Sequence, residues 1–196
     1  MNAPLTDDKI NKFNTLYGEA CELQKNLVIL DGVPRMKPGF LGKSKLKKSI
    51  QLFEEALSIH PGSWQSMYFI GKAYQALGEN ENALSWFVKA GKIEPEDPSL
   101  AKEAGLCAAQ LGRHAVAIKL MKEAASAHPE DAGLQCNIGL SYLMSERVDE
   151  ARAAFSRAVQ ADPGNQMNTK LLKLTDSVAE NRIQCPRSEE EILKLL

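Results

Sequence analysis

The chain carries a register that repeats at a constant interval, the step from Pro61 to Pro95. Prolines, glycines, alanines and large apolar residues all keep this step. The matching sets are Pro61, Pro95, Pro129 and Pro163; Gly71, Gly105 and Gly139; Ala83, Ala117 and Ala151; and Phe53, Phe87, Met121 and Phe155. A fixed period of this length indicates stacked supersecondary units, each of which buries its apolar face against its neighbours.

Residues 64–97 show what one repeat encodes. Its apolar residues mark one face of a first helix and one face of a second: Met67, Ile70 and Tyr74, then Ala83, Phe87 and Ala90. Gly78 stands where a positive φ can end the first helix, and Pro95 stands where the second helix cannot continue. Each repeat is therefore predicted to be a pair of short antiparallel helices.

The pattern Ile70-Gly71-x-x-Tyr74, Ala83-x-x-x-Phe87-x-x-Ala90 and Pro95 resembles a tetratricopeptide repeat. Two further copies follow at the same spacing, and the middle one departs most, with Ala108 and Met121 in place of aromatic residues. The resemblance implies an all-α fold, a right-handed superhelical solenoid of helix-turn-helix (tetratricopeptide) repeats.

We expect a single domain over residues 1–196. Its predicted parts are a degenerate first repeat at 7–61 with an insertion at 31–48, regular repeats at 64–97, 98–131 and 132–165, and a C-terminal capping helix and tail at 166–196. The first helix is predicted to begin after Thr6 and to extend to about Leu30, with the extra residues of this repeat lengthening it and adding a loop.

A capping box, Ser188 with Glu191 three residues later, predicts a short helix near the C-terminal end. A helix this short needs a docking surface. We expect it to dock on the end of the stack, through Leu171, Leu174 and Val178, or on a second copy of the chain, which would give a homodimer.

In proteins with this repeat, the first helices of successive units line an inner groove. Carried over by repeat position, the resemblance implies a peptide-binding groove made by Gln65, Tyr68, Lys72, Gln75, Lys102, Leu106, Cys136, Asn137, Leu140 and Lys170. Leu143 and Leu174 occupy groove positions as well. This surface changes from polar and basic to apolar along the chain, which suits a peptide with an acidic part and an apolar part.

Some members of the family hold the C-terminal carboxylate of heat-shock chaperones with a five-residue clamp. Only Lys102 and Asn137 match that clamp here, whereas Leu106, Met167 and Leu171 do not. The resemblance therefore does not extend to chaperone-tail binding.

Composition limits the compartment and the partners. The net charge of −1 gives no general attraction to nucleic acid or to a membrane. The N-terminal residues lack the layout of a signal peptide, and no apolar run reaches the length of a membrane span. We therefore expect a cytoplasmic protein with no membrane partner. A basic cluster from Arg35 to Lys48 is either a solvated face or a docking surface for an acidic partner.

Catalytic and metal-binding motifs are absent from the sequence. The four cysteines form no Cys-x-x-Cys pair, and His60 and His128 share a repeat position near a helix end, where the helix dipole favours them. We expect no enzyme, no cofactor and no metal. The sequence favours a non-enzymatic scaffold or adaptor that binds a protein or peptide segment in its groove. A self-associating structural protein, or a chaperone or regulatory subunit of another protein, is the alternative.

Overall fold

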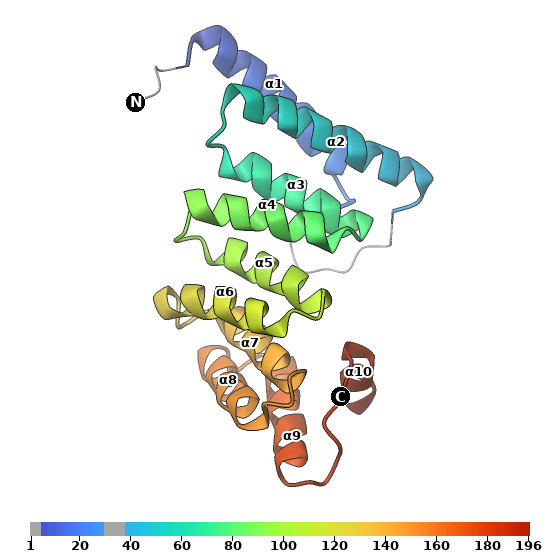
Figure 1. Cartoon of the computed structure of the whole chain (residues 1–196), viewed down its shortest axis with the longest axis vertical. Coiled ribbons are helices and arrows are strands. Elements are labelled where there is room, and N and C mark those ends of the chain that lie inside the picture. The colour runs from blue at the N-terminus through green and yellow to red at the C-terminus, as the bar shows by residue number, and fades with distance from the viewer. Residues whose placement is uncertain (1–4, 30–37) are drawn as a thin grey trace. The chain divides into compact units, whose positions relative to one another are not determined.

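The structure is a computed structural model, and it describes residues 5–29 and 38–196. Every regular element in these two ranges is an α-helix, as predicted (Figure 1). The helices are α1 Asp7–Gln24, α2 Phe40–Ile59, α3 Trp64–Leu77, α4 Asn80–Ile93, α5 Pro98–Gln110, α6 His114–Ala127, α7 Ala132–Leu143, α8 Val148–Ala161, α9 Gln166–Ala179 and α10 Glu189–Leu195.

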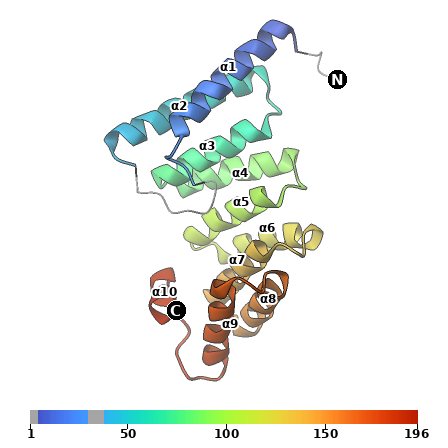
Figure 2. The same ribbon diagram turned by 180° about the vertical axis from the view of Figure 1, so that it is seen from behind.

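The helices belong to two compact units, Met1–Pro95 with α1 to α4 and Glu96–Leu196 with α5 to α10. In the first unit α1 packs on α2, α2 on α3 and α3 on α4. In the second unit α5 packs on α6, α6 on α7, α7 on α8 and α8 on α9 (Figure 2). Within each unit, consecutive helices are therefore neighbours, as in a stack of helical hairpins. The single domain over 1–196 stays a prediction.

The starts of α3, α5, α7 and α9, the first helices of the later units, are fixed by a side chain at one repeat position. These N-cap residues are Ser63, Asp97, Asp131 and Asn165, each one repeat after the last, and each accepts a hydrogen bond from a backbone N–H of its helix. Such caps satisfy donors that have no partner inside the helix. Gly78 ends α3 with φ 80°, as the sequence predicts.

The two helices of a repeat pack closely because a glycine of the first helix faces a large side chain of the second. A β-carbon on Gly71 would lie 2.7 Å from Phe87 Cε1, and one on Gly105 would lie 2.5 Å from Met121 Cγ. The shared alanines Ala83, Ala117 and Ala151 are fully buried, so the predicted contact positions lie in the core.

The first repeat differs from its predicted form. α1 ends at Gln24, where Leu30 was expected, and α2 is already helical from Phe40, inside the expected insertion 31–48. The extra residues thus lengthen both helices, to 18 and 20 residues, rather than the first alone. Residues 31–37 of that insertion, with Arg35, lie outside the described residues.

Gln24 is the last residue of α1 and connects it to two other helices. Its buried side-chain amide donates to Ser49 Oγ of α2 and to the Phe69 carbonyl oxygen of α3, both at 3.0 Å. Asn26 then turns the chain away with φ 62°. One polar side chain therefore joins three helices of the first unit.

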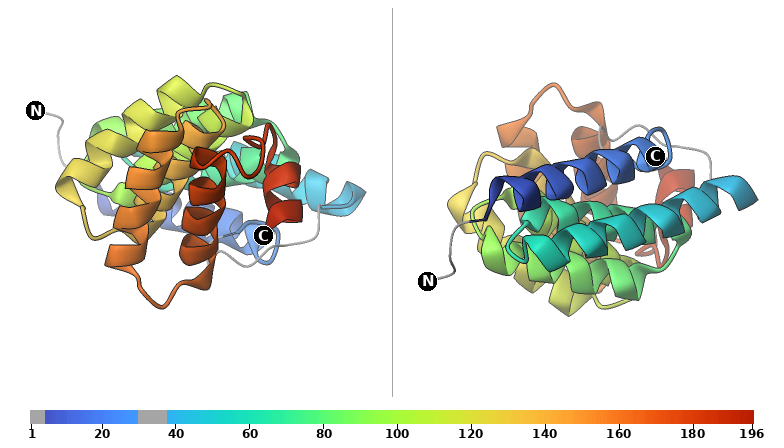
Figure 3. Two further views of the ribbon diagram at one scale, coloured as in Figure 1. Left: turned by 90° about the horizontal axis from the view of Figure 1, so that it is seen from below. Right: turned by 90° about the horizontal axis from the view of Figure 1, so that it is seen from above.

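The C-terminal segment forms the predicted short helix at a different place. The capping box is present, because Ser188 Oγ accepts from the Glu191 N–H at 3.1 Å. In all views α10 lies on the side of its unit away from α8 (Figure 3). The expected docking residues Leu171, Leu174 and Val178 are themselves buried, and Ile192 of α10 instead shares a cavity with α5 and α7.

Candidate peptide-binding surface

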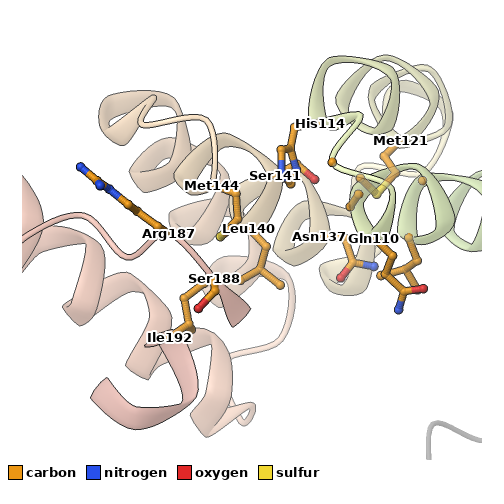
Figure 4. Close-up of a pocket in the computed structure, with 14 residues that line it drawn as sticks. Gln110, His114, Met121, Asn137, Leu140, Ser141, Met144, Arg187, Ser188 and Ile192 are labelled. Carbon is orange, nitrogen blue, oxygen red and sulfur yellow. The ribbon is translucent and has the colours of Figure 1, made fainter. Parts of the chain in front are cut away.

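The second unit holds a cavity of about 420 Å³ between α5, α7 and the C-terminal segment (Figure 4). We call the part of its wall made by α5 and α7 the α5–α7 face. It is formed mainly by Leu106 and Ala109 of α5, by Asn137, Leu140 and Ser141 of α7, and by Met144. Arg187, Ser188 and Ile192 close the other side.

Helical spacing explains why these side chains meet. Asn137, Leu140 and Met144 follow one another at steps of three and four, which puts them on one face of α7. Leu106 and Leu140 hold the same position in successive repeats, and so lie alike on α5 and α7. The face is mainly apolar, and the amides of Gln110 and Asn137 can orient a bound backbone.

Lys102 lies one turn before Leu106 on α5 and is engaged by an acid. Its Nζ donates to Asp131 Oδ2 at 2.8 Å, while Asp131 Oδ1 accepts from the Leu134 N–H at the start of α7. Burial opposes ionisation of Asp131, but the hydrogen bonds from Lys102 and from the Leu134 and Gly133 N–H groups hold its pKa below the usual value. Lys102 is therefore a paired cation in the absence of a partner.

Cys136 also occupies a predicted groove position, on α7. Burial raises the pKa of its thiol to about 11, so the side chain is a neutral thiol at neutral pH. It contributes a small, weakly polar group rather than a nucleophile.

Three of the predicted groove residues, Leu106, Asn137 and Leu140, line this cavity. Lys102 and Cys136 are on the same two helices but do not line it. Lys170 is exposed on α9 and donates to the Leu196 carbonyl oxygen at 3.1 Å. Leu143 and Leu174 are buried in the core and are not available to a ligand.

The other predicted groove residues belong to α3 in the first unit. Gln65 is exposed and Gln75 half-buried. Tyr68 is half-buried too, with its ring 5.7 Å from that of Phe87. Lys72 is only 5% exposed, and its role in the groove stays a prediction.

Sequence reasoning missed the segment that faces the α5–α7 face. Arg187, Ser188 and Ile192 were not assigned to the groove, and Met144 was not either. The signal present was the Ser188–Glu191 capping box, which predicted a helix but not its docking surface.

Among the described residues, no group of three or more His, Cys, Asp or Glu is arranged to hold a metal ion. A search of the same residues for a membrane-crossing helix finds none that is long and apolar enough.

Comparison with known proteins decides the family. The family described as tetratricopeptide repeat matches residues 70–132 and 102–166. The chain is a tetratricopeptide repeat protein. The predicted all-α solenoid fold is confirmed with it, because solved tetratricopeptide structures superpose on almost the whole chain.

One such structure is MamA, residues 41 to the end, from Desulfovibrio magneticus RS-1. It has a TM-score of 0.72 and 16% identity, over 98% of this chain and 95% of that one. A second is the first tetratricopeptide domain of Spaghetti (RPAP3) bound to the HSP90 peptide SRMEEVD. It has a TM-score of 0.57 and 18% identity, over 60% of this chain and 93% of that one. At these identities the likeness is one of fold.

A curated relative is Superkiller protein 3 of Schizosaccharomyces pombe, which is 24% identical over 121 residues. That alignment covers 62% of this tetratricopeptide repeat protein but only 9% of the relative's length.

Proposed function

We propose that this tetratricopeptide repeat protein is a non-enzymatic scaffold or adaptor that binds a peptide segment on its α5–α7 face. The binding residues in this proposal are Leu106, Asn137 and Leu140, with Lys102, Cys136 and Lys170 at its margins. Gln65, Tyr68 and Gln75 remain candidate contacts on α3 of the first unit.

The observation that carries the proposal is that a helical segment of the chain itself lies at this face. Ile192 of a short helix is buried, at 3% exposure, and lines the same cavity as Leu106, Leu140 and Met144. A surface that holds one helical segment by an aliphatic side chain has the shape and the chemistry to hold another. The bound peptide of the RPAP3 domain supports peptide binding as the class of function for this fold.

Four free cysteines support a reducing compartment such as the cytoplasm. The chemistry of the α5–α7 face supports a binding role, since its wall combines aliphatic side chains with the amides of Gln110 and Asn137. The neutral Cys136 thiol near it is not poised as a nucleophile.

The test is capture of partners from the native lysate by the tagged full chain, identified by mass spectrometry. Leu140→Asp places a charge on the α5–α7 face and should remove the partners, because an apolar anchor cannot pack on a carboxylate. Val116→Asp is the matched control, since Val116 is 44% exposed on α6 and does not line the cavity. Both variants are first checked for native helicity and melting.

Loss of partners in Leu140→Asp with retention in Val116→Asp supports the proposal. Retention of the same partners at the same yield in both variants would show that the α5–α7 face is not the binding surface.

Self-association is the second candidate, and α10 carries the observation that favours it. Leu193 and Leu195 are 68% and 48% exposed on this helix, an unusual display of aliphatic side chains on seven residues. Light scattering of wild type and Leu193→Asp/Leu195→Asp decides it. A dimer that the double variant dissociates supports self-association, whereas a monomer in both excludes it.

A further inference from the structure

The segment Cys185–Leu196 folds back along the inner side of its own unit and is held there at several points. The Cys185 thiol donates to the Leu143 carbonyl oxygen at 3.4 Å, and Pro186 is buried. Ile192 is buried at the cavity, and the Leu196 carbonyl oxygen accepts from Lys170. Figure 4 shows Ser188 and Ile192 next to Leu140 and Met144, and farther from Gln110 and Met121.

This attachment depends on few side chains. Helix α10 has seven residues, which is too short to be stable without a surface to dock on. Ile192 is its one described apolar side chain that is buried, because Leu193 and Leu195 point to solvent. The cap is local, with Arg187 N–H donating to Glu191 Oε2 at 2.7 Å, and it moves with the segment. Within α10 itself, the aliphatic anchor is therefore Ile192.

We propose that residues 185–196 are an intramolecular ligand of the α5–α7 face, and that a partner peptide binds by displacing them. The inference rests on the proposed function and names the chemistry of its partner. That partner carries an aliphatic side chain in place of Ile192, on a helical turn whose start is capped by a hydroxyl and a carboxylate. Glu190 and Glu191 of the segment are exposed, which indicates that an acidic flank is compatible with this site.

A tethered ligand competes at high effective concentration. A short linker gives an effective concentration on the order of 1 mM, so a segment with a dissociation constant near ~100 µM in trans weakens a competitor about tenfold. A change of that size is easily measured. Competition of this strength also leaves the α5–α7 face accessible to a partner that binds more tightly than the segment does.

The experiment uses a fluorescent synthetic peptide of residues 185–196, with Cys185→Ser, and full-length chains. Anisotropy titrations measure its affinity for the wild type, for Ile192→Asp and for Ile192→Ala. Both variants release the tethered segment and should bind the peptide about tenfold more tightly than the wild type. Leu193→Asp is the matched control on the exposed side of α10 and should bind it as the wild type does.

Two further titrations assign the site. The same peptide carrying Ile192→Asp should not bind, and Leu140→Asp added to the Ile192→Ala chain should abolish binding of the unmodified peptide. Thermal melts identify any chain that is not folded, and Ile192→Ala, which introduces no charge, keeps the test valid if Ile192→Asp unfolds.

Equal affinity of wild type and Ile192→Ala for the peptide would overturn the proposal, and so would the absence of binding to every chain. These outcomes are separable from failure of the proposed function. If Leu140→Asp still loses its lysate partners, only the intramolecular ligand is disproved. A different result is that the Ile192 variants bind the synthetic peptide more tightly while Leu140→Asp still captures its lysate partners. In that case the segment covers the α5–α7 face, and the partner binds at another surface.

Discussion

Lys102 Nζ of α5 lies 2.8 Å from Asp131 Oδ2 at the start of α7. This pair links the first helices of two successive repeats next to the α5–α7 face, and Asp131 also caps α7. Lys102 was expected to bind an acidic ligand, and the structure instead shows it in an ion pair within the chain. Any acidic peptide that binds Lys102 has to compete with a carboxylate already in place.

Mutation of Asp131 should separate its two roles, the ion pair with Lys102 and the N-cap of α7. Asn is as good a cap as Asp, so Asp131→Asn removes the charge alone, whereas Asp131→Ala also removes the cap and should cost about 1 kcal/mol more. Chemical denaturation of the three chains at pH 7 measures both differences. Equal stability of the Asn and Ala variants would contradict the capping role.

The charge of Asp131 should also leave a pH signature. Its pKa is lowered in the folded chain, so the stabilisation is present above its ordinary value and is lost as pH falls through the lowered one. We expect the difference in melting temperature between wild type and Asp131→Asn to hold from pH 7 to about pH 5 and to shrink below about pH 4. A difference that is constant down to pH 2 would show that the ion pair contributes nothing.

Gly139 tests the close approach of α7 and α8. A β-carbon there would lie 2.7 Å from Phe155 Cε1, and the Phe155 ring is fully buried and cannot move aside. Gly139→Ala should therefore destabilise the fold by ~1–3 kcal/mol. Gly105→Ala should destabilise the fold as well, because a β-carbon there would lie 2.5 Å from Cγ of Met121, which is also fully buried.

Gly18 is the control for that substitution. It lies inside α1, and a β-carbon added to it would have no atom of another part of the chain within 4 Å. Gly18→Ala should therefore stabilise the protein by ~0.5–1 kcal/mol through helix propensity. Denaturant melts of the three variants give the order. A Gly139→Ala variant as stable as Gly18→Ala would contradict the tight helix contact.

The repeats were predictable because their positions encode contacts between adjacent helices in the stack. Gly71, Ala83 and Phe87 recur at fixed spacing, and the structure places them in the core. The N-cap residues follow the same period, but their hydrogen bonds are seen only in the structure. They are Ser63, Asp97, Asp131 and Asn165.

The first repeat and the C-terminal segment were less predictable, since neither follows the period. Gln24, the last residue of α1, reaches two other helices, which no local pattern reports. Where α10 docks depends on which apolar surface is still free. Leu171 and Leu174 are buried, and Ile192 lines the cavity at the α5–α7 face.

The side-chain hydrogen bonds of Gln24 should contribute measurably to the stability of the first unit. Gln24→Leu keeps the volume but removes the donor to Ser49 and Phe69, and leaves the Phe69 carbonyl without that hydrogen bond. We expect a loss of ~1–3 kcal/mol. Gln51→Leu, on the exposed side of α2, should change stability by less than ~0.5 kcal/mol. Comparable melts for the two variants would show that the Gln24 hydrogen bonds are not needed.

Cys136 offers a chemical probe of the α5–α7 region. With a pKa raised to about 11 by burial, its thiolate is scarce at pH 8, and its alkylation depends on that thiolate. A pKa about two units higher lowers the thiolate fraction ~100-fold, while the greater nucleophilicity of a more basic thiolate restores about tenfold. Iodoacetamide should therefore label Cys136 at least tenfold more slowly in the folded chain than in denaturant, with a rate that keeps rising up to about pH 11. Peptide mapping by mass spectrometry follows each cysteine separately. A labelling rate that levels off near pH 9 would contradict the burial of this thiol.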